Sequence, residues 1–232
     1  MPPRALEPAG IALVDKPRGP SSFAIVADIR RKTGARTGHA GTLDPFATGL
    51  LLLLSGRSTK FAPRLVGLDK RYLTEIDLSA RTSTGDPEGE VIARDEPPTD
   101  AELGARLESL RASLYARSPS IPAASAVKID GERAYKLARR GVEVEMPLRR
   151  STVYALDLMA YADGVAVLDL TVSSGTYVRA IADALGGHCV SLRRTAVGPF
   201  SVADAVTPDK FVPECLLTEA SVLAALDAAG VA

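Results

Sequence analysis

The sequence predicts an α/β protein of the α+β type, with a mixed, mainly antiparallel sheet and flanking helices. Three observations predict this class. Apolar residues alternate with polar ones in some stretches and recur at helical spacing in others. The two patterns do not follow a regular strand–helix–strand alternation, which disfavours a doubly wound parallel sheet. The composition, 46% hydrophobic and 24% charged over 232 residues, suffices for a sizeable core.

The first third of the chain predicts two strands, a helix and a glycine-rich loop. Residues 11–14 form a short apolar strand, which ends at a proline- and glycine-enforced turn over 16–20. Ser21 or Ser22 can cap a helix with apolar positions at helical spacing, followed by the basic run 30–32. Residues 38–49 form a loop punctuated by glycine, and the run 50–54 is a candidate for a buried strand.

The rest of the chain predicts strands and helices in turn. Residues 72–78 alternate as a half-exposed strand. The capping box Thr99–Glu102 opens a helix with leucines on one side. Residues 165–172 form another strand, and residues 177–185 form a helix that Gly186-Gly187 stops. Residues 218–229 suggest a short helix near the C-terminus.

Composition excludes several classes of protein. No apolar run approaches the ~20 residues of a membrane helix, and no secretory signal is visible, so we expect a cytoplasmic protein. Cys189 and Cys215 are too few for a disulfide scaffold and lack metal-site spacing, and with His188 they are interpreted as structural. A length of 232 residues indicates one full domain with a small appendage.

Charge is segregated along the chain although the net charge is zero. Residues 1–74 carry a balance of +7, residues 75–108 carry −7, residues 109–199 carry +4 and residues 200–232 carry −4. Such segregation can give a basic face for a polyanionic partner. The alternative is that the acidic block folds against the basic one and neutralises it.

The most informative stretch is Gly38–Gly49, with the sequence GHAGTLDPFATG. Its glycines permit tight turns, and Pro45 biases Asp44 toward an extended backbone. A carboxylate on a rigid loop at a strand edge can act as a nucleophile or base. The alternative is an Asx-turn of purely structural value. The loop lacks the Gly-Lys-Ser/Thr ending of a phosphate-binding loop.

This stretch resembles the signature of the TruB family of tRNA pseudouridine synthases. Further segments resemble the family in the same order: Lys16-Pro17-x-Gly19, Lys70-x-Tyr72, Thr82-x-Thr84-x-Asp86-x-x-Gly89, Ser125-Ala126-x-Lys128-x-x-Gly131, Tyr135-x-x-Ala138-Arg139, Ser174-Gly175-Thr176-Tyr177-Val178-Arg179 and Leu192-Arg193-Arg194-Thr195. The resemblance covers residues 11 to about 200. It implies a pseudouridine synthase fold, with a catalytic domain over 1–200 and a short extension over 201–232 in place of most of the usual PUA-like module.

The resemblance implies an isomerase that converts uridine 55 in the T-loop of tRNA to pseudouridine, without a metal or organic cofactor. Asp44 matches the essential catalytic aspartate. Whether it attacks C1′, adds to the base or abstracts the C2′ proton stays open. Two rival hypotheses are an RNA-binding relic without chemistry, which an intact Asp44 disfavours, and a relative acting on ribosomal RNA or at guide-directed sites, which the form of the GTLDP loop disfavours.

The resemblance also implies roles for other residues. The matching tyrosine, Tyr72, packs against the target base; otherwise it is a sheet-face aromatic. Arg179 pairs with the catalytic aspartate, and its place in the first turn of a helix also suggests a carboxylate partner. Leu192 lines the base pocket. The remaining candidate substrate-binding residues are His39, Gly41, Thr42, Leu43, Tyr177 and Lys16, the last of which could equally lie in a solvated turn.

The expected partner is the T-arm of tRNA, with no membrane, no obligate protein partner and a monomeric enzyme. Basic pairs and runs are candidates for phosphate contacts: Arg30-Arg31-Lys32, Arg139-Arg140, Arg149-Arg150 and Arg193-Arg194. The family pattern is not matched everywhere. Phe23-Ala24 follow Ser22 where the family often has Asn or His and then Asp, and the segment between Arg179 and Leu192 is shorter than usual.

Overall fold

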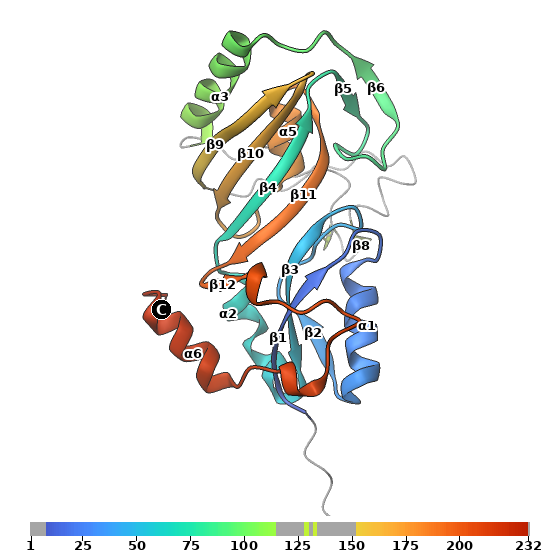
Figure 1. Ribbon diagram of the computed structural model, residues 1–232, viewed down its shortest axis with the longest axis vertical. Coiled ribbons are helices and arrows are strands. Elements are labelled where there is room, and N and C mark those ends of the chain that lie inside the picture. The colour runs from blue at the N-terminus through green and yellow to red at the C-terminus, as the bar shows by residue number, and fades with distance from the viewer. Residues whose placement is uncertain (1–7, 115–127, 130–131, 134–151, 232) are drawn as a thin grey trace, which may run out of the picture. The chain divides into compact units, whose positions relative to one another are not determined.

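The computed structural model describes residues 8–114, 128–129, 132–133 and 152–231 (Figure 1). The chain divides into two compact units. Unit 1 combines the chain up to Tyr72 with the chain from Leu192 onward, and unit 2 is Leu73–Ser191. Unit 1 is therefore discontinuous in sequence, and two strands, β4 (Lys70–Asp77) and β11 (His188–Val197), contribute residues to both units.

Unit 1 is built on the long leucine-rich strand β3 (Thr48–Ser55). Strand β1 (Gly10–Lys16) pairs with it antiparallel along its whole length, from Gly10 opposite Ser55 to Lys16 opposite Gly49. Strand β2 (Thr37–His39) also pairs with β3 antiparallel. On the other side, β11 runs parallel to β3, with Arg193 and Arg194 opposite Thr48 and Gly49, and β12 (Phe200–Ser201) pairs with β11.

Helices and 3₁₀ turns complete unit 1. They are α1 (Ser22–Thr33), η1 (Gly56–Phe61), α2 (Ala62–Val66), η2 (Val202–Asp204), η3 (Pro213–Cys215) and α6 (Glu219–Ala228). Ser21 caps α1 by accepting a hydrogen bond from the Ala24 N–H, and Thr218 caps α6 in the same way. The core consists of buried apolar side chains: Ile11, Leu13, Ala40, Leu50, Leu52, Leu54, Leu65, Leu68, Val197, Phe200, Val222 and Leu226.

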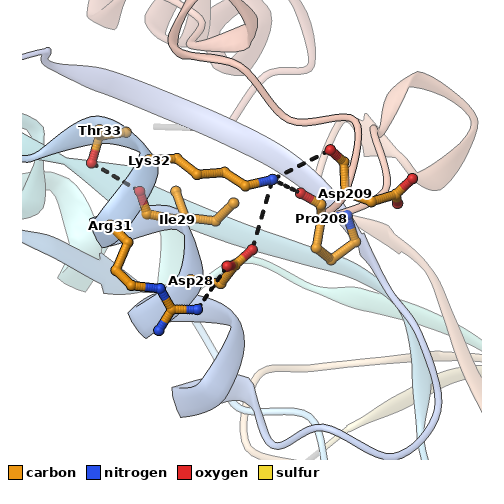
Figure 2. Close-up of polar contacts among 7 residues, drawn as sticks. All are labelled: Asp28, Ile29, Arg31, Lys32, Thr33, Pro208 and Asp209. Atoms are coloured by element: carbon orange, nitrogen blue, oxygen red, sulfur yellow. Dashed lines mark hydrogen bonds and ion pairs between the residues drawn. The ribbon is translucent and has the colours of Figure 1, made fainter.

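The segment after β12 runs back along the open edge of β1 (Figure 1). The backbone of Leu13 and Asp15 exchanges hydrogen bonds with Val206, and that of Ile11 with Leu217. Figure 2 shows that a side chain also holds this segment: the Lys32 ammonium donates hydrogen bonds to the carbonyls of Pro208 and Asp209. These contacts cover the backbone groups of an edge strand that would otherwise be exposed.

Unit 2 contains the antiparallel pair β9 (Val153–Ala162) and β10 (Val165–Val172), joined by a tight turn at Asp163-Gly164. A second small sheet pairs β5 (Ala80–Thr82) with β6 (Val91–Arg94), and β7 (Lys128–Ile129) pairs with β8 (Glu132–Arg133). The helices in the described part of this unit are α3 (Asp100–Leu114) and α5 (Val178–Ala184). Among the described residues, hydrogen bonding orders the main sheet β1-β3-β11-β4-β10-β9.

The predicted fold class is confirmed, since the sheet is mixed and mainly antiparallel with helices beside it. The strands predicted at 11–14, 50–54, 72–78 and 165–172 and the helices predicted after Ser21, at Thr99, at 177–185 and at 218–229 are all present. Strands β5, β6, β9 and β11 were not predicted, and Gly38 and His39 lie in β2 rather than in the loop. Over the described ranges, no helix has both the length and the apolar character needed to cross a bilayer.

Candidate active site

The loop that carries Asp44 joins β2 to β3 and spans residues 40–47. Ser22, in the first turn of α1, holds it through two hydrogen bonds. The Ser22 hydroxyl donates to the Leu43 carbonyl and accepts from the Leu43 N–H, each at 2.8 Å, and Ser22 is only 2% exposed. Asp44 itself is half-buried, and its carbonyl accepts from the Ala47 N–H. The peptide group immediately before Asp44 is therefore anchored to a helix.

Lys16 holds the opposite end of the loop. Its ammonium group is fully buried and donates to the carbonyls of Ala47 at 2.7 Å, Pro17 at 2.9 Å and Pro45 at 3.2 Å. The alternative of a solvated turn for Lys16 is therefore wrong, because its side chain has no exposed surface, while substrate binding by Lys16 stays a prediction. Lys16 instead fixes the chain on the C-terminal side of Asp44.

Arg194, in β11, holds the N-terminal side of the loop. Its guanidinium is buried and donates from Nη2 to the Gly41 carbonyl at 3.0 Å, from Nη1 to the Thr42 carbonyl at 3.5 Å and from Nε to the Leu50 carbonyl at 2.7 Å. Gly41 has φ +96°, a left-handed conformation that favours glycine and turns the backbone toward Arg194. Ser22, Lys16 and Arg194 thus bind backbone groups on both sides of Asp44.

The last glycine of the signature has a steric role. Gly49 has φ +101°, and a Cβ there would lie 2.2 Å from the carbonyl oxygen of Arg194. Because β3 and β11 approach this closely, only glycine fits at this position. The close approach fixes the position of the Arg194 backbone relative to the loop.

Lys70 adds another buried cation to unit 1. It is 6% exposed, and its ammonium donates to the carbonyls of Val66 and Leu68. Burial, and secondarily the neighbouring charge of Arg194, lower the pKa of Lys70 to about 8, while Asp69 acts in the opposite direction. The region around the loop is accordingly rich in buried positive charge.

The other candidates from unit 1 lie on the strands that carry this loop or run beside it. Tyr72 is buried on the inward-facing side of β4, where Lys70, Thr74 and Ile76 share its face. Leu192 is buried in β11, two residues before Arg194. His39 is half-buried at the end of β2, and Thr42 is exposed while Leu43 is buried. Unit 1 therefore holds Lys16, His39, Gly41, Thr42, Leu43, Asp44, Tyr72 and Leu192.

Unit 2 holds the two remaining candidates, Tyr177 and Arg179. Arg179 lies in the first turn of α5, as predicted, and is 4% exposed. Its Nη1 donates to the Thr84 carbonyl at 2.8 Å and lies 3.4 Å from a carboxylate oxygen of Asp86. Tyr177 occupies the N-cap position of α5, and its carbonyl accepts the first helical hydrogen bonds.

Asp86 is a residue whose role the sequence analysis did not identify. Its other carboxylate oxygen accepts from the Thr84 hydroxyl at 2.5 Å and from the Glu88 N–H at 3.1 Å. Its carbonyl accepts from the Thr82 hydroxyl at 2.8 Å. Two segments quoted for their family resemblance, Thr82–Gly89 and Ser174–Arg179, therefore meet in one hydrogen-bonded network. Within this unit the carboxylate beside Arg179 is that of Asp86, and the pairing of Arg179 with Asp44 stays a prediction.

The basic residues predicted to contact phosphates differ in their burial and in the groups that they bind. Arg194 is buried, so its assignment to phosphate contact is wrong. Arg193 forms a bidentate ion pair with Asp15, at 2.8 and 3.0 Å, and its side chain is 40% exposed. Lys32 is fastened to residues 208–209, while Arg31 pairs with Asp28 at 72% exposure (Figure 2). Arg139-Arg140 and Arg149-Arg150 lie outside the described residues.

The described residues offer no group of three or more His, Cys, Asp or Glu side chains placed to hold a metal ion. Cys189 is buried and accepts a long hydrogen bond from the Thr74 hydroxyl, and His188 contacts the Ala80 carbonyl through Nδ1 at 2.9 Å. What the loop offers chemically is a carboxylate on a backbone held at both ends. Such a group is suited to nucleophilic or general-base chemistry that needs no change of oxidation state.

Comparison with protein families gives a match over residues 30–178 to the TruB family pseudouridylate synthase (N terminal domain). Among curated sequences, "tRNA pseudouridine synthase B" of Corynebacterium diphtheriae is 40% identical over 239 residues, which cover 95% of this chain and 79% of the relative. The protein of the same name from Leifsonia xyli subsp. xyli is 45% identical over 210 residues, covering 84% of this chain and 68% of the relative.

Solved structures with a similar fold include the crystal structure of the archaeal box H/ACA sRNP Nop10-Cbf5 complex, with a TM-score of 0.61 and 22% identity. The match covers 90% of this chain and 54% of that chain, so the present chain spans about half of the solved one. A crystal structure of pseudouridylate synthase matches with a TM-score of 0.50 and 18% identity, over 95% of this chain and 75% of that one. At these identities the likeness establishes the fold alone.

Proposed function

Because the chain belongs to the TruB family of pseudouridylate synthases, which are isomerases, we propose that it converts uridine 55 in the T-loop of tRNA to pseudouridine with Asp44 as its catalytic aspartate. The tRNA substrate is supported by the relatives named tRNA pseudouridine synthase B. The observation that carries the assignment of Asp44 is the anchoring of its loop by Ser22, Lys16 and Arg194.

A held loop matters because the reaction needs one carboxylate at one place. Isomerisation breaks the N1–C1′ bond of uridine, turns the uracil and forms a C5–C1′ bond. The proton on C5 leaves and N1 gains one, so no electrons are exchanged with another molecule. Attack on C1′, addition to the base and abstraction of the C2′ proton all use the ionised carboxylate of Asp44. This chemistry requires neither a metal nor an organic cofactor.

The neighbouring candidates take supporting roles in this proposal. Tyr72 stacks on the target uracil, and its hydroxyl assists removal of the C5 proton. Leu192 lines the apolar side of the base pocket. Arg179 pairs with Asp44, which keeps the carboxylate ionised and aimed, while Asp86 and Thr84 hold the guanidinium of Arg179 in place.

The substrate is bound through its T-arm, from which the target base is extruded. Extrusion costs a few kcal/mol, which stacking and pocket contacts offset. The active species in this proposal is a monomer that needs no protein partner. Because the substrate is bound through its T-arm, an isolated T-stem-loop is expected to be modified almost as well as whole tRNA.

The test is incubation of the purified protein with an unmodified tRNA transcript in the presence of a chelator, followed by mapping of pseudouridine. We expect modification at position 55 alone, by a species of monomer mass in light scattering. The transcript with cytidine at position 55 serves as the substrate control. The absence of pseudouridine from every T-loop would exclude the proposal.

Asp44→Asn tests the assignment of the catalytic residue. The amide keeps the shape of the side chain but removes its charge, so turnover should be abolished while RNA binding is retained. The matched control is Asp157→Asn, which changes an exposed carboxylate in β9 and should leave turnover at the wild-type level. Wild-type turnover by the Asp44→Asn protein would refute the assignment. Mapping on total RNA distinguishes tRNA from ribosomal targets.

A further inference from the structure

The guanidinium of Arg194 is a buried charge whose observed hydrogen bonds go to backbone carbonyls. It is 1% exposed and donates to the carbonyls of Gly41, Thr42 and Leu50. A buried charge is costly unless hydrogen bonds replace its lost hydration. Three such bonds do so here, and two of them end on the turn that leads into Asp44.

Arginine is suited to this task because its donors lie in a rigid planar fork. The Nε–H reaches Leu50 in β3, while the two terminal nitrogens reach Gly41 and Thr42 in the loop. One side chain thereby sets the distance between the strand and the turn. An ammonium group has no fixed fork and holds these positions less strictly.

The backbone of Arg194 is held in place as firmly as its guanidinium. Its backbone pairs with Gly49 at the start of β3, where the two chains approach too closely for any Cβ. The turn itself has φ +96° at Gly41, so its carbonyl points where an ordinary residue rarely directs it. Loss of the guanidinium would free this turn while leaving the strand pairing in place.

We infer that Arg194 is a positioning residue for Asp44, acting through the Gly41-Thr42 turn. The inference rests on the proposed function, because it assigns a role within the same site. Since the guanidinium is buried, Arg194 contributes to the chemical step and not to the binding of RNA phosphates. A displacement of about 1 Å in a catalytic group can cost on the order of 100-fold in rate.

The experiment measures the single-turnover rate constant at saturating enzyme, so that affinity does not enter, together with the Kd for the T-stem-loop. Arg194→Met should lower the rate constant by about 100-fold, and Arg194→Lys should recover about tenfold of this because one carbonyl can still be bound. The Kd should change by less than about threefold and its salt dependence should be unchanged. Arg57→Met, which removes a 77% exposed arginine paired with Glu219 and assigned no role in catalysis or binding, is the matched control and should keep the wild-type rate.

A double-mutant cycle with Ser22→Ala separates positioning from general stability. Ser22 and Arg194 hold neighbouring peptide groups of one loop, so their effects on the rate constant should be non-additive. The rate constants are compared for the folded fraction at a temperature below the melting transition of every variant. If Arg194→Met does not fold, the Arg194→Lys variant carries the comparison.

Three results would overturn the inference. The first is a wild-type rate constant in the folded Arg194 variants, and the second is additivity of the Arg194 and Ser22 effects on the rate constant. The third is a loss of affinity without a change in the rate constant, in which the slope of log K against log salt falls in magnitude by about 0.7–0.9, because that indicates a phosphate contact. Hydrogen exchange of the Leu43 amide gives a readout without activity, and it should accelerate in Arg194→Met. If the wild-type protein makes no pseudouridine, the proposed function fails, and the exchange rate still decides whether Arg194 holds the turn.

Discussion

Replacement of Ser22 by alanine should destabilise the protein far more than replacement of its neighbour Ser21. The Ser22 hydroxyl is buried and makes two hydrogen bonds to the peptide groups of Leu43, each at 2.8 Å. Its removal deletes both bonds and leaves a buried N–H and a buried carbonyl without this partner. At about 1–2 kcal/mol for each group, the free energy of unfolding should fall by about 2–4 kcal/mol.

Ser21→Ala is a matched control because the same substitution is made one residue earlier at the start of the same helix. The Ser21 hydroxyl accepts one exposed hydrogen bond, from the Ala24 N–H at 3.2 Å. Loss of an N-cap of this kind costs about 1 kcal/mol. Because the chemical change is identical in the two variants, the difference between them isolates the contact with the loop.

Urea unfolding followed by far-ultraviolet circular dichroism measures both values. The dependence on urea should keep the wild-type slope, since neither variant changes the surface exposed on unfolding. A Ser22→Ala protein within about 0.5 kcal/mol of Ser21→Ala would refute the reasoning, because surface substitutions away from special features fall in that range. Single-turnover rates on the same samples should fall for Ser22→Ala alone.

Three further predictions concern the surroundings of the loop and the other unit. Because the pKa of Lys70 is lowered in the folded protein, the unfolded chain binds more protons than the folded one between pH 8 and 10.5. The free energy of unfolding should therefore rise with pH across that window, by at most about 1.4 kcal/mol per pH unit. Urea unfolding at several pH values measures this rise, which Lys70→Met should remove. Gly49→Ala should destabilise by about 3 kcal/mol or more, because strain at a positive φ adds to the close approach of β11, whereas Gly38→Ala meets open space; equal melting temperatures for the two would contradict the steric argument. Asp86→Ala removes the carboxylate beside the buried guanidinium of Arg179 and should cost about 3–5 kcal/mol, against less than about 1 kcal/mol for the exposed Asp95→Ala. A loss of similar size in both variants would show that the buried pair is unimportant.

Elements with a local signal could be predicted from the sequence. The capping box at Thr99 and Glu102 forms as expected, with the Thr99 N–H donating to the Glu102 carboxylate at 2.7 Å and the Glu102 N–H to the Thr99 hydroxyl at 3.3 Å. The hydrogen bonds that the Thr99 N–H and the Thr99 hydroxyl donate to the Glu102 carboxylate lower the pKa of Glu102. Both partners lie within one helical turn, so their spacing alone is sufficient to predict them.

The contacts that build the candidate site join segments far apart in sequence and have no local signal. The motif identified Asp44, but nothing in its spacing indicates that Lys16 and Arg194 are buried beneath the same loop. A lysine in a Pro-Gly turn and a pair of arginines are most often solvated. Strand β11 was not predicted because its buried positions include Arg194, which interrupts the hydrophobic pattern on which strand prediction depends.

The discontinuity of unit 1 has a consequence for how the protein is made on the ribosome. The loop that carries Asp44 and the strand β3 emerge early, whereas the part of β11 from Leu192 onward, and the segment after β12 that covers the edge of β1, emerge only after the whole of unit 2. At roughly 5–20 residues per second, this interval is on the order of ten seconds. During it β3 has β1 and β2 as partners but not β11, and the edge of β1 is uncovered. The nascent chain therefore passes through a stage with exposed strand edges, in which Ser22 and Lys16 can already hold the loop and Arg194 has yet to be synthesised.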